Sequence, residues 1–125
     1  MILLVDANAV IWAFADDGNM DTGASASLQD PVNDVLVSAA TIWEIEVKRR
    51  AGRLRAPDEL LADLQTAGFA TIPMTPEDAV AAAALPMHHR DPFDRILVAQ
   101  ARRLGATIVS RDRSFDAYDV ERLPA

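Results

Sequence analysis

The chain has 125 residues, of which 50% are apolar and 25% charged, and its 19 acidic and 12 basic residues give a formal net charge of −7. This composition excludes a disordered tail, and the length predicts one domain over residues 1–125 that buries roughly two-thirds of its unfolded surface. The lack of cysteine excludes disulfide scaffolds and thiolate metal sites and suits a cytoplasmic protein. The first residues predict neither a signal peptide nor a membrane span.

Short, unbroken apolar runs alternate with helical patterns along the chain. In chain order we expect a strand at 2–5, helices at 7–15 and 22–29, a strand at 35–38, helices at 39–50 and 58–66, a minor strand at 71–73, helices at 76–85 and 92–104, a strand at 107–110, a short helix at 113–117 and a minor strand at 120–122. Gly68 and Gly105 stand where helices should end. This alternation predicts an α/β fold, a three-layer α/β/α sandwich around a mainly parallel sheet.

Two acids follow predicted strands. Asp6 comes directly after residues 2–5, and Asp112 follows Val109 with two residues between them. Ligands of open α/β sheets bind outside the carboxyl ends of the strands, so both acids are candidates for chemistry. Each also precedes a helical turn, so each is equally a candidate for a helix N-cap.

A third carboxylate lies inside the apolar helix 39–50, where it must reach solvent or find a partner. Glu44 is a candidate for function, and the alternative is a surface residue paired with Lys48 four residues later. Position alone does not decide between Glu44 and Glu46.

Residues 88–96 contain two further acids that local chemistry separates. Asp91 precedes Pro92, which predicts an N-cap with proline in the first helical position. Asp94 then falls on the first helical turn, free to point toward the strand ends, where the helix dipole favours its ionised form. We therefore assign Asp91 to structure and Asp94 to function.

Four carboxylates at one edge of a sheet repel one another unless some are protonated or a cation lies among them. Oxygen ligands without thiolates select hard ions, which points to Mg²⁺ or Mn²⁺. Such an ion facing a phosphodiester activates water and stabilises the developing negative charge. The acids therefore predict metal-dependent phosphodiester hydrolysis.

Four segments occur in a recognisable order: LLVDAN at residues 3–8, residues 38–48 with Trp43-Glu44-Ile45 inside them, HRDPFDR at residues 89–95, and VSRD at residues 109–112. Together they resemble the PIN-domain ribonucleases, specifically the VapC-like toxins of bacterial toxin–antitoxin systems. The resemblance implies a Mg²⁺- or Mn²⁺-dependent endoribonuclease that cleaves RNA, forms a homodimer and is neutralised by a cognate VapB-like antitoxin.

The resemblance also assigns residues. Its acidic quartet matches Asp6, Glu44, Asp94 and Asp112, which favours Glu44 over Glu46. Asn8 matches a polar residue common two positions after the first acid, and Ser110 replaces a threonine while keeping the hydroxyl. Ala7 departs from the threonine or serine of many members, which predicts a weaker site if that hydroxyl orders substrate or metal.

Basic residues cluster from position 48 to position 55 despite the acidic whole. They either hold RNA phosphates beside the site or complement the negative end of the helix dipole. The candidates for RNA binding are Lys48, Arg49, Arg50 and Arg53.

The remaining polar and aromatic residues are assigned mainly to structure. Asp116 either supports the metal site or faces solvent, and the two histidines before Asp91 are expected to be solvated rather than catalytic. We expect structural contacts for Arg95, Arg111 and Arg113. For Trp12, Phe14, Trp43 and Phe93 we expect a place in the core or in a dimer interface.

Two alternatives to the ribonuclease remain. The first is a PIN-fold protein without activity that only binds a partner, although the presence of all four acids does not favour it. The second is a Mg²⁺-dependent phosphotransfer domain. Asp6-Ala7-Asn8 lacks the second aspartate that a phosphatase of the haloacid-dehalogenase type needs at position 8.

Overall fold

The computed structural model describes residues 1–15 and 17–125, and its centre is one sheet of five strands in the order β3-β2-β1-β4-β5. Every neighbouring pair of strands is parallel. The strands are β1 (Ile2–Val5), β2 (Asp34–Ser38), β3 (Ala70–Ile72), β4 (Thr107–Val109) and β5 (Glu121–Leu123). The helices are α1 (Ala7–Ala15), α2 (Thr22–Gln29), α3 (Ala39–Arg50), α4 (Leu60–Thr66), α5 (Pro76–Ala84), α6 (Pro92–Leu104) and the 3₁₀ helix η1 (Arg113–Ala117).

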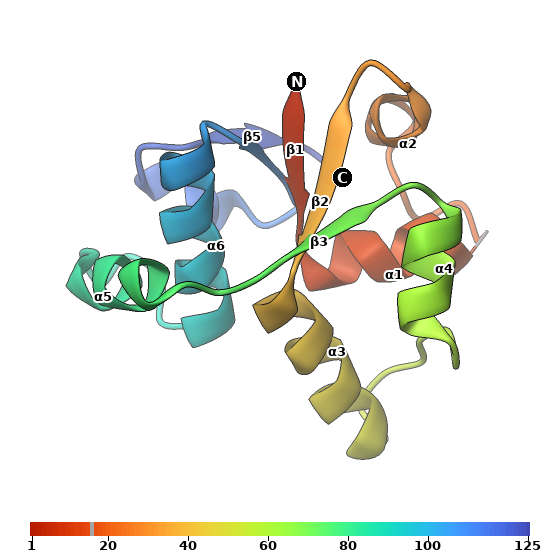
Figure 1. Cartoon of the computed structure of the whole chain (residues 1–125), viewed down its shortest axis with the longest axis horizontal. Helices are drawn as coiled ribbons and strands as arrows, with labels where there is room; N and C mark the ends of the chain where they lie inside the picture. Colours follow the sequence, from red (N-terminus) through yellow and green to blue (C-terminus); the bar gives the residue numbers. More distant parts are fainter. Residues whose placement is uncertain (16) are drawn as a thin grey trace.

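The strand β1 divides the core into two clusters. Leu3 and Val5 point into a cluster with α1, α2 and α4, whereas Leu4 points into a cluster with α6 and Phe115 of η1. All three β1 residues are fully buried, as expected for a strand covered on both faces. Figure 1 shows α1, α2 and α4 on one side of the sheet and α5 and α6 on the other. The predicted three-layer sandwich is confirmed.

The predicted elements differ from the observed ones mainly at their ends. The helix expected from residue 58 begins at Leu60, and Glu59 at its N-cap makes no side-chain capping bond. The helix expected to reach Leu85 ends one residue earlier, since Pro86 forces Leu85 into an extended conformation. The short segment 113–117 is a 3₁₀ helix, and both minor strands are shifted by one residue.

The two helices α5 and α6 are fastened at the start of α5. Thr75 and Asp78 form a reciprocal capping box, and the Asp78 carboxylate accepts two hydrogen bonds from Arg103 of α6 at 2.7 and 2.9 Å. The Arg103 guanidinium lowers the pKa of Asp78 to about 2. Within the described residues, no helix has the length and apolarity that crossing a bilayer requires.

Replacing Asp78 with alanine should lower the free energy of unfolding by about 2 kcal/mol, because the capping box and the ion pair are lost together. Urea unfolding followed by circular dichroism at pH 7 measures the change. At pH 2 the difference between the variant and the parent protein should shrink, because half of the Asp78 carboxyls are then protonated in the folded state. An undiminished difference at pH 2 would show that the Arg103 pair contributes nothing.

Candidate functional site

The site lies where β1 and β4 end. These neighbouring strands send the chain to opposite faces of the sheet: α1 packs with Val5, whereas Phe115 of η1 packs with Leu4. Open α/β sheets bind their ligands at this kind of reversal in strand order. Asp6 and Asp112 follow the two strands, so they stand on either side of the reversal.

Asp6 is both a helix cap and a buried acid. Its Oδ1 accepts the backbone N–H of Ala9 at 2.9 Å, while the residue is only 7% exposed. Burial raises the pKa of the Asp6 carboxyl, and the negative charges of Glu44 and Asp112 add to this effect. Hydrogen bonds with Ser110 and Ala9 oppose it. The capping interpretation is therefore correct, and it does not remove Asp6 from the acidic cluster.

Asp112 combines the same two roles. Its Oδ1 accepts the backbone N–H of Ser114 at 2.8 Å, and its Oδ2 lies 3.2 Å from Nε2 of His89. Partial burial acts to raise the pKa of Asp112, but the Ser114 hydrogen bonds and the nearby His89 outweigh it, so the pKa lies below its usual value. The fully buried Ser110 accepts the Asp112 N–H at 3.0 Å and hydrogen-bonds to Asp6, which links the two strand-end acids.

The start of α6 separates its two acids as predicted. Oδ1 of Asp91 accepts the backbone N–H groups of Phe93 and Asp94, which confirms the cap. The Asp94 side chain turns toward His89, with Oδ2 2.8 Å from Nε2.

The helix dipole is not the main influence on the charge of Asp94. Burial raises its pKa to about 7, helped by the negative charges of Asp91, Asp6 and Glu44 and opposed by His89. The helix dipole is worth at most about 2 kcal/mol in favour of the ionised form. Removal of the carboxylate from water and repulsion by its neighbours exceed that contribution.

Glu44 is a buried member of the same cluster. It is 5% exposed, and its charge raises the pKa of both Asp6 and Asp94. The expected pairing with Lys48 is present at 2.5 Å, but it occurs on a buried rather than a surface carboxylate. Glu46 pairs instead with a basic residue further along α3. The structure thus separates the two glutamates, which their positions in the sequence did not.

His89 is the residue that the sequence analysis missed. Nε2 of its imidazole lies between the carboxylates of Asp94 and Asp112, and Nδ1 accepts the backbone N–H of Asp91 at 3.3 Å. Because Nδ1 accepts a hydrogen bond, a neutral ring carries its proton on Nε2, the nitrogen nearest to the two acids. The expectation of a solvated histidine fails because packing on η1, far along the chain, holds the ring. Its place two residues before the Asp91 cap was the available signal.

The residues expected to support the site, Asn8 and Asp116, lie at its edge. Asn8 is exposed on the first turn of α1. Asp116 makes a two-bond ion pair with Arg122 at 2.8 and 3.0 Å, and Arg122 also donates to the Ser110 carbonyl at 3.1 Å. The Arg122 hydrogen bonds lower the pKa of Asp116. The link between Asp116 and the acids therefore passes through Arg122 and the backbone.

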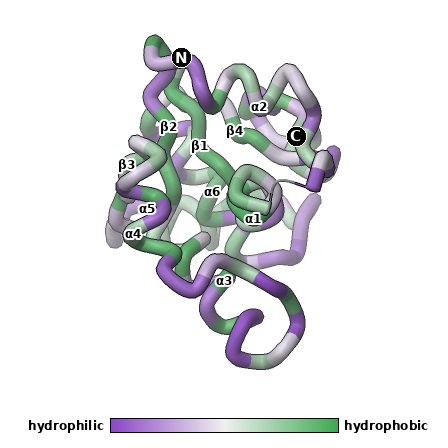
Figure 2. Tube along the Cα trace, turned by 90° about the vertical axis from the view of Figure 1, so that its right-hand side faces the viewer, coloured by the Kyte–Doolittle hydropathy of each residue, from purple (hydrophilic) through white to green (hydrophobic). Residues whose placement is uncertain are grey.

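The basic segment is divided between paired and exposed residues. Lys48 binds Glu44, and Arg49 binds Glu46 at 2.6 Å and lies 3.6 Å from Asp58. The exposed basic residues are Arg50, Arg53 and Arg55. Figure 2 shows hydrophilic residues gathered at the far end of α3 and in the loop that follows it.

Structural contacts hold Arg95 and Arg111, as expected. Arg95 donates only to backbone carbonyls among the described residues, and Arg111 stacks 4.0 Å from the ring centre of Trp12 and donates to the Ala125 carbonyl. Trp12 and Phe14 pack against the core. Trp43 is 64% exposed and meets Phe93 edge to face, so this pair belongs to the surface.

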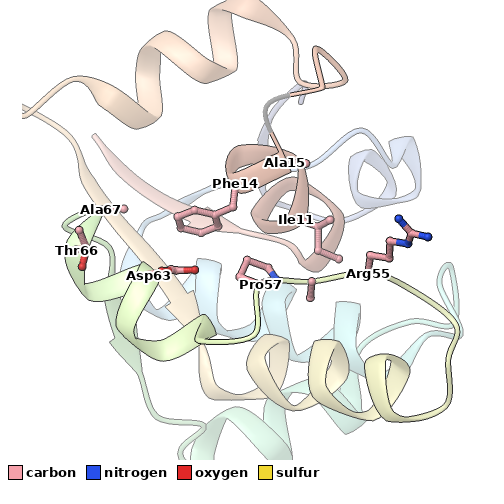
Figure 3. A pocket seen from close by; sticks show the side chains of 9 residues that line it. Ile11, Phe14, Ala15, Arg55, Pro57, Asp63, Thr66 and Ala67 are labelled. Carbon is pink, nitrogen blue, oxygen red and sulfur yellow. The ribbon is translucent and has the colours of Figure 1, made fainter.

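Two of the larger grooves formed by the described residues lie outside the acidic cluster. Figure 3 shows one of about 570 Å³ between α1 and the segment 55–67, with Phe14 and Ile11 on one side and Asp63 and Thr66 on the other. The second, of about 610 Å³, is lined by α3, α5 and α6 and includes Trp43. None of the four acids lines either groove.

The donor set suits a hard divalent cation. Ligand atoms of His89, Asp94 and Asp112 all lie within 4.8 Å of one another. Burial, together with the neighbouring negative charges, raises the pKa of Asp6 and Asp94, and a cation bound among these acids would favour their ionised forms. Carboxylate oxygens are the ligands that Mg²⁺ and Mn²⁺ prefer. The residues therefore fit the ion that the sequence implies.

Comparison with known proteins relates the whole chain to one group. Ribonuclease VapC22 from Mycobacterium tuberculosis is 27% identical over 119 residues, covering 93% of this chain and 91% of the relative. The structure of VapBC2 from Rickettsia felis bound to a promoter DNA fragment superposes with a TM-score of 0.72 at 13% identity, covering 99% of this chain and 98% of that one. FitAcB from Neisseria gonorrhoeae gives a TM-score of 0.62 at 22% identity, with coverage of 98% and 96%.

These solved structures share the fold of this chain, at identities too low to carry its chemistry. The family comparison is more direct, because residues 3–121 match the PIN domain. That range includes all four strand-end and helix acids described above. With a parallel five-stranded sheet and an acidic cluster at its carboxyl edge, the chain belongs to the PIN domain family.

Proposed function

We propose that residues 1–125 form one PIN domain that acts as a Mg²⁺- or Mn²⁺-dependent endoribonuclease toxin. The observation that carries this proposal is a cluster of acids in a member of the PIN family: the buried Asp6 and Glu44, the half-buried Asp94 and, beside them, Asp112. The ribonuclease named as a relative supports RNA as the substrate. Family membership leaves the phosphotransfer alternative without support.

The four carboxylates are proposed to hold the metal. A bound Mg²⁺ or Mn²⁺ supplies a Lewis acid for the phosphodiester and lowers the pKa of water. Asp94 comes from α6 and Asp112 from the end of β4. Asp6, at the end of β1, and Glu44, on α3, add further negative charge. Ser110 fixes the relative position of Asp6 and Asp112 through its hydroxyl.

The exposed basic residues after α3 are proposed to contact RNA phosphates. Lys48 and Arg49 are held in ion pairs, so Arg50 and Arg53 are the better donors of the four residues expected from the sequence. Asn8 and Asp116 are proposed to support the site from its edge.

Replacing Arg53 with alanine should weaken binding of single-stranded RNA and lower the slope of log affinity against log salt by about 0.7, because one phosphate contact is lost. Filter binding in EDTA at several salt concentrations measures the slope without cleavage. Arg102→Ala removes the same charge from an exposed position about 12 Å along α6 from Asp94 and serves as the control. Equal slopes for Arg53→Ala and the parent protein would remove Arg53 from the RNA interface.

The partners follow from the relatives. A VapB-like antitoxin is proposed to neutralise this chain, and the solved VapBC structures of the same fold support such a partner. A location in the cytoplasm stays a prediction. The homodimer stays a prediction. The exposed Trp43 beside Phe93 gives it an apolar surface, and sedimentation of the purified chain tests it.

The activity is tested with antitoxin-free protein and total cellular RNA, with and without Mg²⁺ or Mn²⁺. The expected result is cleavage that requires the metal and disappears in Asp6→Asn. Fragment ends then locate the target RNA. A folded protein that cleaves in neither metal would favour the partner-binding alternative.

A further inference from the structure

Arg95 is a buried cation that no carboxylate accompanies among the described residues. It follows Asp94 on α6, is 8% exposed, and its Nη2 donates to the carbonyls of Ala82 and Leu85, both at 2.8 Å. Its Nη1 donates to Pro86 O at 3.0 Å. These carbonyls belong to the last turn of α5 and the residues after it, where helix carbonyls lack partners and the dipole is negative. Arg95 therefore fixes the end of α5 on α6.

Tyr118 closes the loop that leaves α5. Its hydroxyl donates to the Pro86 carbonyl at 2.8 Å and accepts the backbone N–H of His89 at 2.9 Å. The Tyr118 hydroxyl oxygen thus links Pro86 and His89, the first and last residues of the segment 86–89. Tyr118 comes directly after η1, the element that begins at the Asp112 cap, so the loop and the β4 end are joined.

His89 is held from several directions at once. Tyr118 binds its N–H, and Arg95 donates to its carbonyl at 3.3 Å. Its ring lies edge-on to Phe115 with centres 5.9 Å apart, and its Nδ1 accepts the Asp91 N–H. The Nε2 position near the two acids is therefore set by the loop and not by the imidazole alone.

We propose that Arg95 and Tyr118 are positioning residues that hold residues 86–89 so that His89 fixes the spacing of the Asp94 and Asp112 carboxylates. The contribution to catalysis rests on the proposed ribonuclease function, whereas the contribution to metal affinity does not require RNA cleavage. Residues that orient metal ligands from outside typically change affinity by about 10- to 100-fold when replaced.

The other end of the α5–α6 pair provides a matched comparison. Asp78 and Arg103 fasten α5 at its start, as Arg95 does at its end. Within the described part of the chain, the Asp78 side chain hydrogen-bonds to Thr75 and Arg103 and not to residues 86–89. If Tyr118 and Arg95 act only by stabilising the fold, Asp78→Ala should weaken metal binding as much as a Tyr118 or Arg95 variant that is destabilised to the same extent. A positioning role predicts that it does not.

Tyr118→Phe removes the hydroxyl and keeps the ring, so it is the main test. In the metal-free protein, the Nε2–H signal of His89 in a nitrogen–proton correlation spectrum should be visible in the parent and lost through solvent exchange in the variant. His88→Gln assigns the signal. Calorimetric Mn²⁺ affinity should fall about tenfold in Tyr118→Phe and stay unchanged in Asp78→Ala.

A double-variant cycle with His89→Ala identifies the route of the effect. If Tyr118 acts through His89, adding Tyr118→Phe to His89→Ala produces no further loss of Mn²⁺ affinity. Arg95→Lys, which keeps the charge but cannot reach the same carbonyls, should repeat the Tyr118→Phe result if it folds. The proposal would be overturned if Tyr118→Phe kept the His89 signal and the Mn²⁺ affinity of the parent protein. It would also be overturned if Asp78→Ala lost both to the same extent. Absence of RNA cleavage by the parent protein would instead contradict the proposed function.

Discussion

Asp94→Asn should lower the rate of metal-dependent RNA cleavage by about a thousandfold, because a lost metal ligand removes several kcal/mol of transition-state stabilisation. The same substitution leaves the fold intact. Asp94 is a buried carboxyl that the neighbouring acids repel, so a neutral amide of similar shape should keep or raise the melting temperature of the metal-free protein. Single-turnover cleavage of a mapped RNA and thermal unfolding in EDTA measure the two effects.

Asp91→Asn is the matched control for this experiment. It makes the same chemical change three residues earlier, and asparagine caps a helix about as well as aspartate does. We therefore expect Asp91→Asn to cleave at close to the parent rate. Mg²⁺ should raise the melting temperature of the parent and of Asp91→Asn but not of Asp94→Asn. Normal cleavage by Asp94→Asn would refute its assignment as a metal ligand.

The metal-free protein should lose stability as the pH rises from about 4 to about 7. Asp94 has a folded pKa of about 7 against a usual value of 3.8, and the pKa of Asp6 is raised as well. In this window the folded state binds more protons than the unfolded chain, so the free energy of unfolding falls with increasing pH. The decrease from Asp94 should amount to roughly 2–4 kcal/mol.

Urea unfolding in EDTA at pH 5, 6, 7 and 8 measures this slope, and Mg²⁺ at pH 8 should restore the lost stability by binding the ionised carboxylates. Asp94→Asn should flatten most of the slope. The acids with lowered pKa values, Asp78, Asp112 and Asp116, act in a separate window below pH 4, where stability falls as the pH decreases. Stability in EDTA that increases from pH 5 to pH 8 would contradict the raised pKa of Asp94.

Local chemistry made much of the fold and part of the site predictable. The Asp91 cap, proline at the start of α6 and glycine at its end set this helix through contacts within four residues, and they also separated Asp91 from Asp94. The unbroken apolar run of β1 indicated a strand covered on both faces. The order of the acids along the chain was enough for the family resemblance, which the PIN match confirms, and for the prediction of metal chemistry.

Tertiary structure decided the environment of each acid. The sequence placed Asp94 at a helix start, where the dipole favours the ionised form, but burial and the neighbouring acids raise its pKa to about 7. It left Glu44 and Glu46 undecided until packing buried one and left the other beside Arg49. It also missed His89, whose position depends on Tyr118, 29 residues later.

The sequence by itself determined the order and approximate position of the helices and strands, because caps, prolines and apolar runs act over a few neighbouring residues. Only the tertiary structure decided which charges share a buried space, because desolvation and Coulomb energy depend on segments brought together from across the chain. In this protein the acids were visible in the sequence, whereas their protonation and the histidine between two of them were set by the fold.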